Sequence, residues 1–186
     1  MTLLVVELGI PELNQDAALP GTMFAALAER APEILSFFIG FAVLSLYWTA
    51  HHHFFARLRA VSRTFIRLNL FYLALVAFLP FPTAILGEHA ENPVSVALFA
   101  LNVAMISGLE VILFVVATGQ NLTKRSLPPA IRRFGIIASA TPLLVFVVSI
   151  PIAFWNPTAA LYSWLLSIPV GVIVDRYAPT GAGEYL

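Results

Sequence analysis

Long uninterrupted runs of apolar residues dominate the sequence and alternate with short polar segments. Five runs are long enough to be complete membrane crossings, at about residues 34–56, 68–86, 94–118, 134–155 and 158–174. An α-helix needs about 20 mostly apolar residues to cross a hydrocarbon core of ~30 Å. The pattern therefore predicts an all-α, polytopic membrane helix bundle, a single domain over residues 1–186, with five complete transmembrane helices.

A further apolar run at residues 1–10 is half as long as a crossing requires, and it stops at Pro11. A cleaved signal peptide would begin with basic residues, which this run lacks. A short re-entrant or interfacial helix is a second alternative. We expect instead the outer half of a first transmembrane helix whose beginning precedes Met1.

The composition agrees with a bilayer environment and excludes several classes of protein. Apolar residues make up 60% of the chain and charged residues 11%, against about 45–50% and ~25% in soluble domains. Ten basic residues balance ten acidic ones, so no excess of positive charge indicates a nucleic-acid partner. The lack of cysteine removes disulfides, thiol catalysis and Cys-ligated metals.

Basic residues gather at alternate ends of the predicted spans. Lys and Arg near span ends are retained in the cytoplasm. Nine of the ten follow this pattern: Arg57, Arg59, Arg63, Arg67, Lys124, Arg125, Arg132, Arg133 and Arg176. The opposite ends hold Arg30 and most of the acidic residues. The charge pattern thus predicts a cytoplasmic C-terminus.

Three consecutive histidines, His51, His52 and His53, follow Tyr47 and Trp48 near the cytoplasmic end of the 34–56 run. Successive residues on a helix are about 100° apart, so the three rings cannot converge on one metal ion. We predict no metal site and favour a polar contact that holds helices together, with a proton or ion path as the alternative. Tyr47 and Trp48 are typical of interfacial aromatic residues.

Glu110 is an acid deep inside a predicted span, and such a residue is a functional candidate by default. With Asn102 and Ser107 it forms a loose polar stripe. The structural alternative is a carboxylate that reaches the inner interface or pairs with a nearby arginine.

The first run places Thr2, Leu3, Val6 and Ile10 on one helix face. A ring of such side chains around an axis would make a narrow constriction that gates by dewetting, with hydroxyls replacing ion hydration. Plain lipid or helix packing is the alternative.

Several motifs together resemble the bacterial members of the transmembrane protein 175 potassium channel family. They are Thr2–Leu8 with Pro11, Tyr47-Trp48 with His51-His52 and Phe55, Leu68-Asn69-Leu70, Leu79-Pro80-Phe81-Pro82-Thr83 and Ser149-Ile150-Pro151. The resemblance implies a six-helix subunit, a homotetramer in the bacterial plasma membrane and a potassium-selective leak through a pore lined by the first helix. Thr2 matches a selectivity threonine, and Leu3 and Val6 match pore-facing positions. The family's Arg-x-x-x-Phe-Ser-Asp signature would lie before Met1.

The resemblance also implies a polar network that packs the helices, with Trp48, His51, His52 and Asn69 at the matching positions. We therefore expect a passive channel whose partners are potassium ions and the lipid bilayer, with no cofactor and no enzymatic activity. A proton-permeable leak channel and a non-conducting scaffold or truncated paralogue remain the alternatives.

Overall fold

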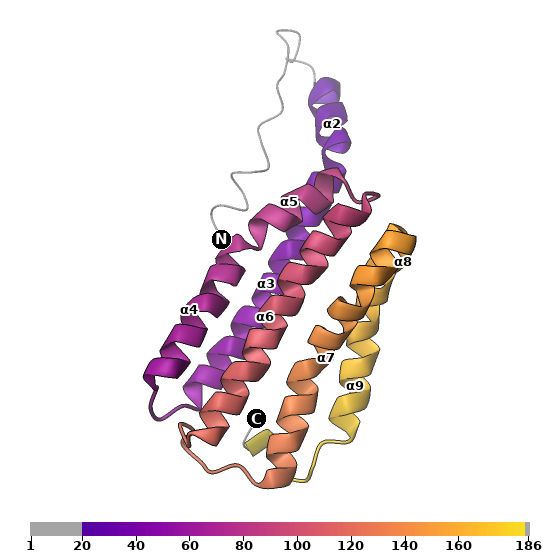
Figure 1. Cartoon of the computed structure of the whole chain (residues 1–186). Helices are drawn as coiled ribbons and strands as arrows, with labels where there is room; N and C mark the ends of the chain where they lie inside the picture. The colour runs from indigo at the N-terminus through magenta and orange to yellow at the C-terminus, as the bar shows by residue number, and fades with distance from the viewer. Residues whose placement is uncertain (1–19, 185–186) are drawn as a thin grey trace.

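The computed structural model of the chain describes residues 20–184, and the regular elements in that range are helices (Figure 1). The prediction of an all-α bundle is therefore confirmed. In chain order the elements are α2 Pro20–Glu29, α3 Ala31–Ala56, α4 Arg63–Phe78, α5 Pro80–Glu88, α6 Pro93–Gly119, α7 Pro129–Trp155, α8 Pro157–Ser163, a 3-10 turn η1 Trp164–Leu166, α9 Ser167–Arg176 and a 3-10 turn η2 Ala182–Glu184.

Four helical segments among the described residues are long and apolar enough to cross a membrane. They are Arg63–Glu88, Pro93–Gly119, Pro129–Trp155 and Pro157–Arg176, and they contain the four later spans predicted from the sequence. The 34–56 run lies within α3, which is 26 residues long. The partial first span at residues 1–10 lies outside the described residues.

Two of the expected spans are interrupted helices. The 68–86 run bends where α4 ends at Phe78 and α5 begins at Pro80 (Figure 1). Proline has no N–H to donate and obstructs the preceding turn. The Leu79 N–H donates to the Val76 carbonyl at 3.3 Å, which is the acceptor that an N–H at position 80 would have used. The Thr83 hydroxyl and backbone N–H both donate to the Leu79 carbonyl, at 2.8 and 3.2 Å. The 158–174 run likewise passes through the 3-10 turn η1.

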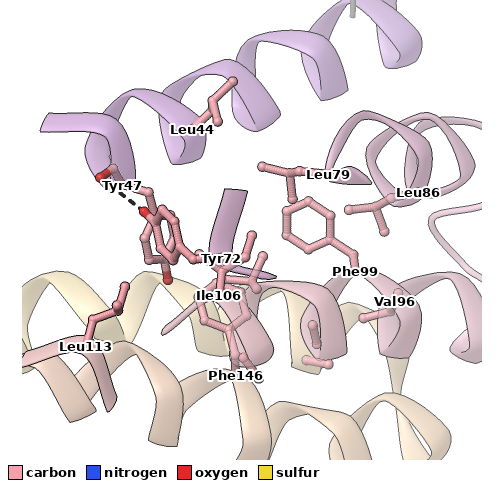
Figure 2. Close-up of a cluster of buried hydrophobic side chains, with 14 of the residues drawn as sticks. Leu44, Tyr47, Tyr72, Leu79, Leu86, Val96, Phe99, Ile106, Leu113 and Phe146 are labelled. Atoms are coloured by element: carbon pink, nitrogen blue, oxygen red, sulfur yellow. Dashed lines mark hydrogen bonds between the residues drawn. The ribbon is translucent and has the colours of Figure 1, made fainter. Parts of the chain in front are cut away.

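Helix α6 is the centre of the bundle, with α4 and α5 on one side and α7 on the other (Figure 1). Its side chains Val96, Phe99, Val103, Ile106 and Leu113 are fully buried. Figure 2 shows Leu79 and Leu86 from the neighbouring segment beside Phe99, and the Phe146 ring of α7 has its centroid 6.5 Å from that of Phe99. Large apolar side chains also cover much of the outer surface, as expected for a surface that faces lipid.

The basic linkers meet at one end of the bundle. Helices α3, α6 and α9 end there, and α4 and α7 begin there (Figure 1). The N–H of Lys124 donates to the Arg57 carbonyl at 2.8 Å, and the Lys124 ammonium donates to the Ala56 carbonyl at 2.7 Å. The antiparallel order of the helices therefore brings the nine basic residues near one face, which we call the basic end.

Candidate functional site

A chain of hydroxyl groups links α3, α4 and α6 inside the bundle. The Tyr72 hydroxyl donates to the Tyr47 carbonyl at 3.4 Å (Figure 2). The Tyr47 hydroxyl is hydrogen-bonded to the Ser107 hydroxyl, and Ser107 donates to the Val103 carbonyl at 2.9 Å. Ser107 therefore accepts from Tyr47. Tyr47 is only 8% exposed, so its interpretation as an interfacial residue is wrong: a nearby serine on α6 gives its hydroxyl a partner inside the bundle.

His51 and Asn69 bring buried polar atoms without partners to the same region. The His51 ring lies between Tyr72 and Phe55, with ring centroids 4.5 and 4.3 Å away. Within residues 20–184, His51 Nδ1 and Asn69 Oδ1 are buried and have no hydrogen-bond partner. Asn69 precedes Tyr72 by one turn of α4, so both face this side of the bundle. Two polar atoms beside the Tyr72 ring are therefore buried without a hydrogen bond from the described part of the chain.

Trp48 and His52 lie on a different face of α3. Their rings stack with centroids 5.2 Å apart and planes 11° from parallel. Trp48 is 61% exposed, and His52 is also exposed. The four residues expected to form one packing network are thus placed in two groups, one buried against α4 and one on the surface.

The polar stripe on α6 is likewise divided between neighbours. Asn102 approaches the Leu75 carbonyl of α4 with its side-chain nitrogen at 3.5 Å, while its oxygen has no partner among the described residues. Ser107 faces α3, as described above. Glu110 turns to another side, where a pocket opens. The stripe therefore does not act as a single surface.

The pocket beside Glu110 has a volume of about 360 Å³ and is lined by three helices. Its walls are Ala50, His53, Phe54 and Arg57 from the α3 end, Glu110 and Phe114 from α6, and Gly135, Ala138 and Ser139 from α7. Within residues 20–184, the Glu110 carboxylate makes no ion pair or hydrogen bond. Partial burial lowers the pKa of the Arg57 guanidinium at the basic end.

Sequence reasoning missed this pocket, although its signal was present. Ala50, His53, Phe54 and Arg57 follow the i, i+3, i+4, i+7 spacing of one helix face. What the sequence did not give is which helices face that stripe.

The remaining predicted site residues, Thr2, Leu3 and Val6, lie outside the described residues. In the described part of the chain, no group of three or more His, Asp or Glu side chains is arranged to hold a metal ion.

Comparison with known proteins identifies the family. The family described as endosomal/lysosomal potassium channel TMEM175 matches residues 1–80. A protein of Streptomyces collinus named a potassium channel is 30% identical over 91% of this chain and 87% of its own length. A potassium channel of a Chryseobacterium species is 23% identical over 95% of this chain and 86% of its own.

A solved structure shares the fold. The crystal structure of a lysosomal potassium-selective channel TMEM175 homolog from Chamaesiphon minutus superposes with a TM-score of 0.75, covering 94% of this chain and 89% of that one at 21% identity. Since the Streptomyces protein matches nearly end to end, this chain is an integral membrane protein that belongs to the TMEM175 family of ion channels.

Proposed function

We propose that the chain is one subunit of a potassium-selective cation channel, which conducts passively and needs no cofactor. The observation that carries the proposal is the 30% identity, over 91% of this chain, to a relative named a potassium channel. Conduction is downhill, so no catalytic group is required and no enzymatic activity is proposed.

The filled interior of the bundle supports a pore that runs between subunits. Along α6 the side chains of Phe99, Val103 and Ile106 are 0% exposed and pack against neighbouring apolar residues. An ion moving past them would lose its hydration without receiving oxygen ligands in exchange. A pore on the symmetry axis of a homotetramer avoids this barrier, and we assign its lining to Thr2, Leu3 and Val6 in the first apolar run.

The nine basic residues at the basic end support an orientation with that end, and the C-terminus, in the cytoplasm of a bacterial cell. The membrane is then the plasma membrane.

A proton-permeable leak is the second candidate, favoured by one observation. The human relative named an endosomal/lysosomal proton channel is 36% identical over 73 residues, 39% of this chain and 14% of its own length. The shared part is thus found in a protein named for proton conduction.

Ion flux from vesicles tests both candidates. The full chain is reconstituted into vesicles loaded with potassium or sodium, and release is followed with ion-selective electrodes. We expect potassium release to exceed sodium release, and Thr2→Val to reduce this preference because it removes the hydroxyl at unchanged size. Thr158→Val, at an exposed site on α8, is the matched control.

The other outcomes are equally informative. Proton flux that persists when both ions are replaced by an impermeant cation would support the proton leak instead. Vesicles that contain inserted protein but release none of these ions would overturn conduction and support a non-conducting scaffold.

A further inference from the structure

From the geometry of the pocket at Glu110 we infer that it is a binding site for an amphiphilic organic amine that enters near the basic end. The inference goes beyond ion conduction and does not depend on it. It rests on the shape of the pocket, on the unpaired carboxylate and on the aromatic side chains beside it.

The pocket has the size and lining of a small-molecule site. Its volume of about 360 Å³ falls in the range of ligand pockets, ~300–1,000 Å³. Small side chains of two helices, Ala50 on α3 and Ala138 on α7, leave the space open. Most of the wall is apolar, and a few polar groups stand within it, as in sites that fix the orientation of a ligand.

Glu110 supplies the charge that selects the ligand. It lies about two and a half turns before the end of α6 at Gly119, or ~14 Å along the axis at ~1.5 Å per residue. An intramembrane carboxylate without a partner is costly, and an ammonium group provides both the opposite charge and hydrogen-bond donors. Ser139 on α7 lines the same pocket, and its hydroxyl has no partner within residues 20–184.

Two aromatic rings favour a cation in the same place. Phe54 and Phe114 both line the pocket, with ring centroids 6.1 Å apart. A ring face attracts an organic cation and also contacts its hydrocarbon part. The carboxylate, the hydroxyl and the rings thus form the elements of an amine site.

Arg57 lines the end of the pocket nearest the basic end, and within residues 20–184 it makes no ion pair with Glu110. Its carbonyl is bonded to Lys124, so its backbone is level with the segment that follows α6. The Arg57 side chain is partly exposed, so solvent screens part of its charge. The site is expected to favour amines whose outer end carries a hydrogen-bond acceptor for Arg57 or His53.

Calorimetry on the full chain in detergent micelles tests the inference with two probes of matched shape, 4-phenylbutylamine and the neutral 4-phenylbutanol. The heat of partition into protein-free micelles is subtracted. We expect the amine to bind about tenfold more tightly than the alcohol, a difference of ~1.4 kcal/mol. Glu110→Gln should remove that difference and leave alcohol binding unchanged.

Two further variants separate the pocket from the rest of the surface. Ala50→Leu fills the pocket from an exposed position and should weaken both probes about fivefold or more. The controls Glu91→Gln and Ala42→Leu, at exposed sites away from the pocket, should change neither probe. Gel filtration checks that each variant remains folded.

Equal binding of amine and alcohol, or unchanged amine binding after Glu110→Gln, would overturn the inference. Full binding in Ala50→Leu would place the amine elsewhere and overturn it as well. Since no ion flux is measured, failure of this inference is distinguishable from failure of the channel proposal.

Discussion

The imidazole ring of His51 lies flat against the phenol ring of Tyr72, with centroids 4.5 Å apart and planes 9° from parallel. The contact joins α3 to α4 through ring faces, while the polar edge of the imidazole is left without a partner: within residues 20–184, no group bonds to His51 Nδ1. The ring therefore contributes to packing mainly as an aromatic surface.

The first prediction follows from this contact. His51→Phe places a phenyl ring against Tyr72 and Phe55 and removes the unpaired nitrogen. The unfolding midpoint of this variant in detergent should therefore equal or exceed that of the unsubstituted protein. His51→Ala removes both ring contacts from this partly buried position, so it should lose about 1–3 kcal/mol. Thermal unfolding followed by tryptophan fluorescence compares the two. A His51→Phe variant as unstable as His51→Ala would show that the nitrogen has a required partner.

The second prediction concerns the bond between Tyr47 and Ser107. Tyr47→Phe leaves Ser107 bonded to the Val103 carbonyl, so it should cost ~0.5–1.5 kcal/mol. Ser107→Ala leaves the buried Tyr47 hydroxyl without its hydrogen-bond partner and should cost more stability, about 1–3 kcal/mol. Unfolding midpoints of the two variants and of the double variant measure this asymmetry. A larger loss for Tyr47→Phe would contradict the assigned direction of the bond.

The third prediction concerns the close approach of α3 and α5 at Gly40. A Cβ atom there would lie 2.7 Å from Thr83 Cγ2 and 3.0 Å from its Oγ1. The threonine cannot turn away cheaply because its hydroxyl is bonded to the Leu79 carbonyl. Gly40→Ala should therefore destabilise the bundle by ~1–3 kcal/mol, as measured by the yield of monodisperse protein and its unfolding midpoint.

A second substitution supplies the test of this mechanism. Thr83→Ala removes both contacting atoms. The double variant Gly40→Ala/Thr83→Ala should therefore lose less stability than the sum of the losses of the two single variants. Gly171→Ala is the control, since a Cβ there meets nothing within 4 Å. If the double variant lost as much stability as the two single variants together, the steric explanation would fail.

The sequence sufficed to predict the membrane spans because each is encoded locally by a run of apolar residues. Local patterns did not settle which prolines interrupt a helix. Pro142 and Pro151 lie inside the continuous helix α7, whereas Pro80 stands at the break between α4 and α5. The segment after Pro80 packs closely on α3, where Thr83 meets Gly40, and the sequence around the proline does not show that contact.

The candidate site was less predictable for the same reason. The spacing of Asn102, Ser107 and Glu110 suggested one stripe, but each residue meets a different surface: α4, α3 and the pocket. Which helices surround α6 is a property of the whole bundle. Residue spacing on one helix gives the direction of a side chain, but it does not identify the group that the side chain meets.

The fourth prediction concerns the orientation of the bundle in the membrane. The natural chain has no cysteine, so single introduced thiols report their location without background. Glu91→Cys lies in the exposed turn between α5 and α6, and Gln120→Cys lies at the other end of α6. A membrane-impermeant maleimide should label position 91 in intact cells and position 120 only after permeabilisation, because basic ends are retained in the cytoplasm.

Val103→Cys is the control for this labelling, since position 103 is 0% exposed and should react only after denaturation. The reverse pattern, with position 120 labelled in intact cells, would place the basic end outside. Such a result would outweigh the charge argument, because labelling reports accessibility directly whereas Lys and Arg counts report only a retention bias. It would also place the mouth of the Glu110 pocket on the outer leaflet, so the amine would have to enter from the outer face.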